Sequence, residues 1–70
     1  MNWSEVRANW TPLREQVERR WSKLSALEIT AIGGRRHELI SILRMRYGID
    51  QESAASEVDD FVRGLQVLSL

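Results

Sequence analysis

Few residues in this 70-residue chain are of the types that carry catalytic or metal chemistry, and His37 is its one histidine. The residues one helical turn away from it are Gly33, Gly34, Ile40 and Ser41, none of which is a usual metal ligand. Glu38 is next in sequence, so on a helix it points about 100° away and is badly placed as an acid–base partner. We therefore expect His37 to lie exposed at the start of a helix.

Three carboxylates near the C-terminus, Glu57, Asp59 and Asp60, raise the question of a cation site. Their spacing does not match the loop of an EF-hand, so we interpret them as the solvated face of a helix. The chain has no cysteine, which excludes a disulfide, a thiolate metal site and a cysteine nucleophile. The sequence thus predicts a protein that is not an enzyme and that binds no cofactor.

A glycine–arginine run, Gly33-Gly34-Arg35-Arg36, is the one motif that could hold a phosphate, through free backbone N–H groups and guanidinium groups at a helix start. It has no preceding strand and no Lys-Ser/Thr pair of the Walker type. We favour the simpler interpretation that the glycines separate two helices.

Charge is balanced over the whole chain but not along it. Ten basic and ten acidic residues cancel to a net charge of zero, which argues against a polycation built to coat nucleic acid or membrane. Residues 1–24 and 25–49 each carry a net charge of +2, whereas residues 50–70 carry −4. The last segment is therefore acidic and everything before it is basic.

Two interpretations of this asymmetry stay open. In the first, the acidic segment packs beside the basic ones and neutralises them within the fold. In the second, a basic face meets RNA, DNA or another acidic partner. That face would consist of Arg19, Arg20, Arg35, Arg36, Arg44 and Arg46. We favour the first, because surface ion pairs of this kind are common and weak.

Apolar residues recur every three or four positions, which predicts an all-α chain. A short helical turn is expected at Ser4–Ala8, and a helix capped by Thr11, with Pro12 at its first position, should run to Ser25. Ser25 and Glu28 form a capping box for a short helix that Gly33-Gly34 ends. Two further helices are expected at Arg35–Tyr47, before a left-handed Gly48, and from the cap Asp50 to about Leu65.

The same spacing predicts the core. The residues expected to be buried are Trp10, Leu13, Val17, Trp21, Leu24, Leu27, Ala31, Ile32, Leu39, Ile40, Leu43, Tyr47, Ala54, Val58, Phe61, Val62 and Leu65. Trp3 could cover the edge of the core or stay exposed for a partner. Three pairs four residues apart, Arg14–Glu18, Glu15–Arg19 and Asp59–Arg63, are expected on exposed helix faces.

Several of these segments, in order, resemble the CsbD-like family of small bacterial stress-response proteins. They are Ala8-Asn9-Trp10, the run from Val17 to Leu24, Ile32-Gly33-Gly34-Arg35-Arg36 with Glu38-Leu39-Ile40, Arg46-Tyr47-Gly48-Ile49, and Ala54 with Glu57-Val58. The resemblance covers nearly the whole chain. It implies a small four-helix domain of two packed helical hairpins, with an extra N-terminal turn allowed, and a role in the general stress response. It implies no known enzymatic activity, cofactor or partner.

The chain departs from this family where it is more apolar. Ile42 and Met45 stand where the resemblance leads us to expect lysine and a polar or acidic residue, and the tail ends in leucines. These departures predict self-association through Ile42, Met45, Leu68 and Leu70.

No targeting signal is apparent. The N-terminus lacks the apolar region of a signal peptide, and no stretch approaches the ~20 apolar residues of a membrane span. We expect one cytoplasmic domain over residues 1–70, without a membrane. The predicted function is a non-enzymatic stress-response protein acting through contacts with another protein. The alternative is a weak nucleic-acid-binding module using the arginine face.

Overall fold

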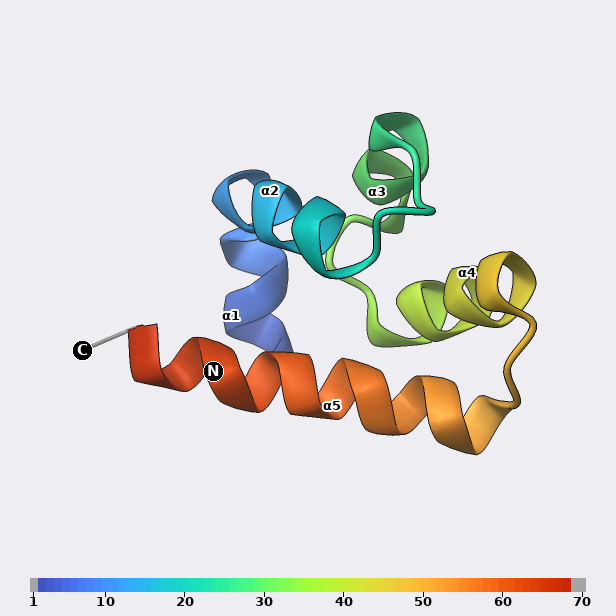
Figure 1. The fold of residues 1–70 in the computed structure, drawn as a ribbon. Helices are drawn as coiled ribbons and strands as arrows, with labels where there is room; N and C mark the ends of the chain where they lie inside the picture. Colours follow the sequence, from blue (N-terminus) through green and yellow to red (C-terminus); the bar gives the residue numbers. More distant parts are fainter. Residues whose placement is uncertain (1, 69–70) are drawn as a thin grey trace.

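A computed structural model describes residues 2–68 of the chain, with side chains as far as Leu65. Five helices follow one another: α1 (Trp3–Ala8), α2 (Trp10–Arg20), α3 (Ala26–Ile32), α4 (Arg36–Tyr47) and α5 (Gln51–Leu68). Residues 2–68 contain no strand, which confirms the all-α class. Figure 1 shows α5 along one side of the molecule, with the shorter helices above it.

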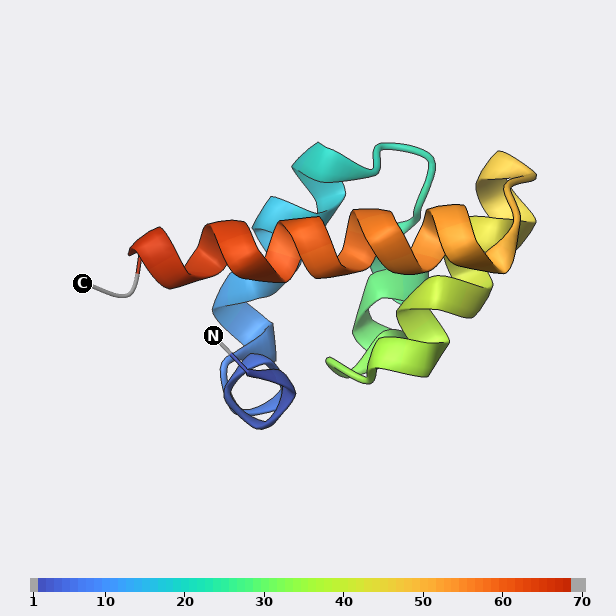
Figure 2. The ribbon, with the colours of Figure 1, turned by 90° about the horizontal axis from the view of Figure 1, so that it is seen from below.

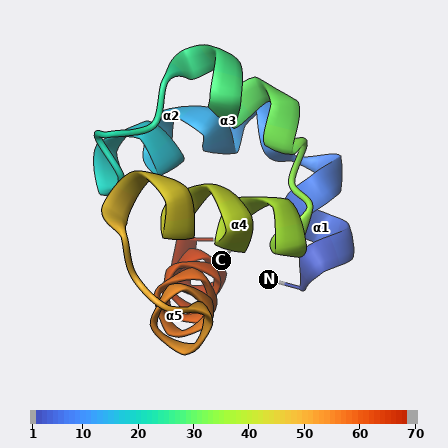
Figure 3. The same ribbon diagram turned by 90° about the vertical axis from the view of Figure 1, so that its right-hand side faces the viewer.

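The extra N-terminal turn that the prediction allowed is α1, whereas the exact arrangement of four helices as two packed hairpins is not confirmed. α4 packs on α5, α2 packs on α3, and α1 packs on α2. In the view from below, α5 lies in front of both the N-terminal helices and α4 (Figure 2). Seen nearly along its axis, α5 has α4 directly above it, and α2 and α3 lie beyond α4 (Figure 3).

Several helix ends follow from local side-chain chemistry, as predicted. Ser25 and Glu28 form the capping box of α3, and the side chain of Asp50 accepts a hydrogen bond of 2.8 Å from the backbone N–H of Ser53. Gly33 and Gly48 end α3 and α4 with φ of 59° and 63°, in the left-handed region that favours glycine.

The predicted bounds of α2 are wrong at both ends. The helix begins at Trp10, and Pro12 stands in its first turn, where backbone N–H groups have no intrahelical acceptor and proline is tolerated. It ends at Arg20 and not near Ser25, because Trp21 turns away with φ of −129° and ψ of 80°. The loop is held by a distant contact, since the backbone N–H of Lys23 donates to the hydroxyl of Tyr47 at 3.2 Å.

Buried apolar side chains from all five helices and the loop after α2 form one core: Val6, Trp10, Leu13, Val17, Trp21, Leu24, Ile29, Ile32, Leu39, Ile40, Leu43, Ala54, Val58, Phe61, Val62 and Leu65. The predicted stripes of α2, α4 and α5 are confirmed, with Tyr47 half-buried. Trp3 is partly buried against the core, so it covers the core's edge.

The predicted face of α3 is wrong at two of its three positions. Leu27 is 84% exposed and Ala31 is also exposed, whereas Ile32 is buried as predicted and Ile29 is buried beside it. The reason lies in α2, because the indole Nε1 of Trp10 donates to the carbonyl oxygen of Ile29 at 2.8 Å. This buried hydrogen bond fits the orientation in which Ile29 faces α2 and Leu27 faces outward.

Candidate functional site

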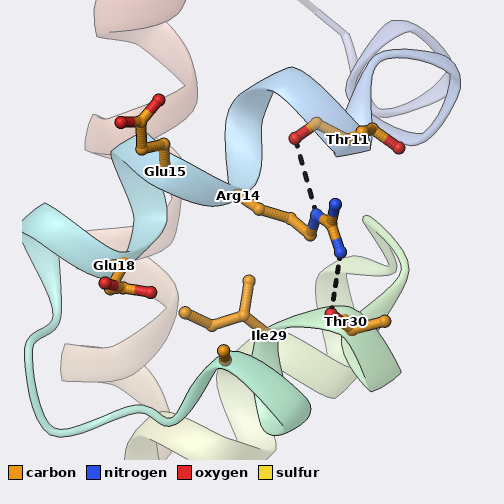
Figure 4. Close-up of a pocket in the computed structure, with 7 residues that line it drawn as sticks. Thr11, Arg14, Glu15, Glu18, Ile29 and Thr30 are labelled. Atoms are coloured by element: carbon orange, nitrogen blue, oxygen red, sulfur yellow. Dashed lines mark hydrogen bonds between the residues drawn. The ribbon is translucent and has the colours of Figure 1, made fainter.

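A groove of about 330 Å³ separates α2 from α3. Its lining consists of Thr11, Arg14, Glu15, Glu18, Ala26, Ile29 and Thr30. Figure 4 shows the Arg14 guanidinium near one end, between Thr11 and Thr30, with Glu18 on the other side of Ile29 and Glu15 pointing away from the guanidinium. The groove is therefore apolar at its floor, cationic at one end and acidic at the other.

Arg14 bridges the two helices of the groove. Its Nη1 donates to the hydroxyl of Thr30 at 2.9 Å, and its Nε lies 3.5 Å from the carbonyl oxygen of Thr11. The predicted Arg14–Glu18 pair does not appear among the ion pairs of the described residues, because the guanidinium turns toward α3. The predicted Glu15–Arg19 pair is confirmed at 3.3 Å.

The six arginines of the predicted basic face lie in different surroundings. Arg36 makes two hydrogen bonds of 3.1 Å to Asp59 of α5, whereas Arg46 pairs with Glu28 of α3. These two guanidinium groups therefore bind carboxylates on two different helices, α5 and α3. Arg44, which lies on α4 with Arg36 and Arg46, is exposed.

The remaining three arginines of that set lie in α2 and in the turn before α4. Arg19 pairs with Glu15, and the guanidinium of Arg20 lies 5.5 Å from the centre of the Trp21 ring. Arg35 Nη2 donates to the carbonyl oxygen of Ala31 at 2.8 Å. Three of the six arginines therefore already pair with carboxylates: Arg19, Arg36 and Arg46.

The acidic last helix neutralises the basic body only in part. Among the described residues, Arg36 is the one member of the predicted face that pairs with α5. Glu57 accepts a hydrogen bond of 3.0 Å from the indole of Trp21, and Asp60 pairs with Arg63 within α5. The predicted Asp59–Arg63 pair is therefore wrong, because Asp59 is taken by Arg36 and Arg63 turns to Asp60.

His37 lies exposed in the first turn of α4, as the sequence predicts. Its Nε2 lies 3.4 Å from Glu38 Oε1, so the two side chains do meet, contrary to the expectation from their positions on the helix. Both side chains are exposed, so no packing keeps them apart. Exposed pairs of this kind contribute little to stability. Among the described residues, no group of three or more His, Cys, Asp or Glu could hold a metal ion.

The residues predicted to mediate self-association also differ in exposure. Met45 is 71% exposed, whereas Ile42 is partly buried and packs against the core. The side chain of Leu68 and the whole of Leu70 lie outside the described residues. Leu27 was not predicted as a surface residue, and the spacing of α3 carries no signal for it, since Leu27–Ala31 and Ile29–Ile32 are both helical stripes.

Glu28 joins two helices electrostatically. Hydrogen bonds from the Arg46 guanidinium and from the backbone N–H of Ser25 lower its pKa from 4.5 to about 2. The same pairing raises the pKa of Arg46. Glu28 thus both caps α3 and ties it to the last turn of α4.

Acidification should therefore weaken the fold through Glu28. Because its folded pKa lies below the unfolded value, this stabilisation is complete above pH 4.5 and is lost as the pH falls toward 2. The melting temperature of Glu28→Gln should lie below that of the unsubstituted protein at pH 7, and the two should converge near pH 2. Glu52→Gln, on the exposed start of α5, serves as the control and should stay close to the unsubstituted protein throughout. A Glu28→Gln difference that is constant with pH would contradict this role.

The fold and site define a small helical protein with an open groove and no recognisable catalytic arrangement in its described part. The chain is 34% identical over 61 residues to UPF0337 protein YjbJ of Escherichia coli K12, covering 87% of this chain and 88% of the relative. It is 33% identical over 66 residues to UPF0337 protein RPA4217 of Rhodopseudomonas palustris, covering 94% and 100%. The chain belongs to the UPF0337 family.

Two other comparisons gave no match, since no family model and no solved structure matches the chain. Within the described part of the chain, the helices are too short or too polar to cross a membrane.

Proposed function

We propose that this protein is a CsbD-like bacterial stress-response protein that is not an enzyme and acts in the cytoplasm through contacts with other proteins. The resemblance of nearly the whole chain to the CsbD-like family carries the proposal. Relatives from two bacteria that match at least 87% of the chain support it by placing the whole chain in one bacterial family, UPF0337. The nucleic-acid alternative receives less support, since Arg19, Arg36 and Arg46 already pair with carboxylates.

The surface that would make such contacts includes two large apolar side chains. Leu27 and Met45 are 84% and 71% exposed, on α3 and α4. Burying them against a partner would remove apolar area from water, which contributes about 25 cal/mol per Å². A second copy of this chain is one candidate partner, as the sequence predicts.

Survival of the host bacterium after stress tests the role. Deleting the gene should lower survival, and the unsubstituted protein should restore it. The Leu27→Lys/Met45→Lys double variant should fold but restore poorly, whereas Ser56→Lys, on the exposed face of α5, should restore fully. His37→Ala should also restore fully if no catalysis is involved. Unchanged survival after deletion would contradict a stress role, and failure of His37→Ala alone would point to catalysis.

Self-association can be measured directly. Sedimentation equilibrium over a concentration series should show oligomers of the unsubstituted protein, and Met45→Lys should shift the equilibrium toward monomer. The shift follows because a lysine ammonium loses hydration when it is buried at an interface. Ser56→Lys adds the same charge elsewhere and should not shift it. A strictly monomeric protein at high micromolar concentration would rule self-association out.

A further inference from the structure

Two arginines from different parts of the chain contact the C-terminal end of α3, and a third lies beside the turn that follows it. Arg14 of α2 donates to the Thr30 hydroxyl, and Arg35 of the following turn donates to the Ala31 carbonyl. Arg7 of α1 lies against Gly34, since a Cβ placed on Gly34 would be 2.7 Å from the Arg7 Cα and 3.1 Å from its Cγ. We refer to Arg7, Arg14 and Arg35 as the α3-end arginines.

The α3-end arginines differ from Arg19, Arg36 and Arg46 in having no carboxylate partner. Among the described side chains, none of the ion pairs involves Arg7, Arg14 or Arg35. The carboxylates on the surrounding helices are held elsewhere: Glu5 caps α1, Glu15 binds Arg19, Glu28 binds Arg46 and Glu38 meets His37. Glu18 lies across the groove, beyond Ile29 from the Arg14 guanidinium (Figure 4).

The end of α3 itself cannot balance these charges. A helix C-terminus carries roughly half an elementary negative charge, whereas three guanidinium groups carry three positive charges. Arg14 uses two N–H groups, toward Thr30 and Thr11, and Arg35 uses one, toward Ala31, so most of the donors of these two arginines stay available. A positive surface with unused donors therefore remains at this point of the fold.

The groove adjoins this surface, and Thr30 adds a hydroxyl group to it. The Thr30 hydroxyl accepts from Arg14, whereas Thr11 faces the Arg14 guanidinium with its backbone carbonyl oxygen (Figure 4). Guanidinium and hydroxyl groups are the side chains that commonly bind phosphate oxygens, and arginine does so with two parallel hydrogen bonds. An anion with several adjacent negative oxygens matches this arrangement better than a single carboxylate.

We propose that the α3-end arginines, with the Thr30 hydroxyl, form a binding site for an anion with adjacent phosphate groups. The adjacent phosphates would come from a free polyphosphate compound or from a single nucleic-acid strand. Because the site includes neither Leu27 and Met45 nor the paired arginines, it stands independently of the proposed function.

Calorimetric titration of the full chain with inorganic tripolyphosphate tests the site, and a short oligothymidylate serves as the second arm. At ~50 mM salt we expect saturable binding of at least one probe, weakened by added salt as phosphate contacts require. The Arg7→Gln/Arg14→Gln/Arg35→Gln variant should bind at least tenfold more weakly. Arg44→Gln, an exposed arginine on α4, should change the affinity less than twofold.

The two probes distinguish the two sources of phosphate. Binding of tripolyphosphate identifies a free phosphate compound as a sufficient ligand, and binding of the oligonucleotide alone assigns the phosphates to a nucleic-acid strand. If the triple variant unfolds, as judged by circular dichroism, Arg14→Lys and Arg35→Gln singly replace it, and each should weaken binding more than Arg44→Gln does. The proposal is overturned if neither probe binds, or if Arg44→Gln lowers the affinity as much as the substitutions of the α3-end arginines do.

Discussion

Replacing Trp21 with alanine should lower the free energy of unfolding by about 3–5 kcal/mol, the usual cost of removing a buried tryptophan. Trp21 is only 2% exposed, and its ring meets Phe61 edge to face at 5.1 Å. Its indole N–H also donates to Glu57 of α5. A chain of this length is stable by roughly 3.5–10 kcal/mol, so the variant should be largely unfolded or close to it.

Urea denaturation followed by far-ultraviolet circular dichroism measures this loss. Trp21→Phe keeps a ring against Phe61 but removes the hydrogen bond to Glu57, so its cost should be smaller, about 1–3 kcal/mol. Trp3→Ala is the matched control, because Trp3 only covers the edge of the core. A loss for Trp21→Ala no larger than that for Trp3→Ala would contradict the packing of Trp21 on α5.

Replacing Gly34 with alanine should be the second most damaging change, at about 2–5 kcal/mol. Its φ of +77° strains any L-residue by roughly 1–2 kcal/mol. The added Cβ would also lie 2.7 Å from the backbone Cα of Arg7, and such overpacking typically costs about 1–3 kcal/mol. Gly34 is thus the point where α1 rests on the turn between α3 and α4.

Two other glycines separate these contributions in the same urea experiment. Gly48 has φ of +63° and open space around it, so Gly48→Ala should cost only the strain, about 1–2 kcal/mol. Gly64 lies inside α5 with nothing within 4 Å, so Gly64→Ala should stabilise the protein by up to about 1 kcal/mol. Equal losses for Gly34→Ala and Gly48→Ala would show that α1 does not approach Gly34 so closely.

Features of the fold that depend on neighbours in sequence could be predicted. The Ser25–Glu28 capping box, the left-handed Gly48 and the buried stripe of α5 each arise within about one or a few helical turns. Their chemistry is readable because the interacting groups are a fixed number of residues apart.

The end of α2 could not be predicted in this way. No glycine or proline follows Arg20 in the loop, and the apolar spacing continues through Trp21 to Leu24. What fixes the loop are contacts with Tyr47, Glu57 and Phe61, which lie 24 to 40 residues further along the chain. The orientation of α3 likewise depends on Trp10, which binds the carbonyl group of Ile29.

The candidate sites show the same limit. The sequence revealed which segments are basic, but a net charge does not tell which arginine meets which carboxylate. Arg36 pairs with Asp59, which is 23 residues away in the sequence, and Arg46 pairs with Glu28, which is 18 residues away. The α3-end arginines come from residues 7, 14 and 35, a set that no local spacing connects.

Affinity capture from stressed cells, with nuclease-treated and untreated lysates compared side by side, tests the central proposal of action through protein contacts most directly. We expect the same partner proteins in both lysates, reduced by Leu27→Lys/Met45→Lys and unchanged by Ser56→Lys. Loss of the captured proteins after nuclease treatment would contradict the proposal, because it would place nucleic acid between this protein and its partners.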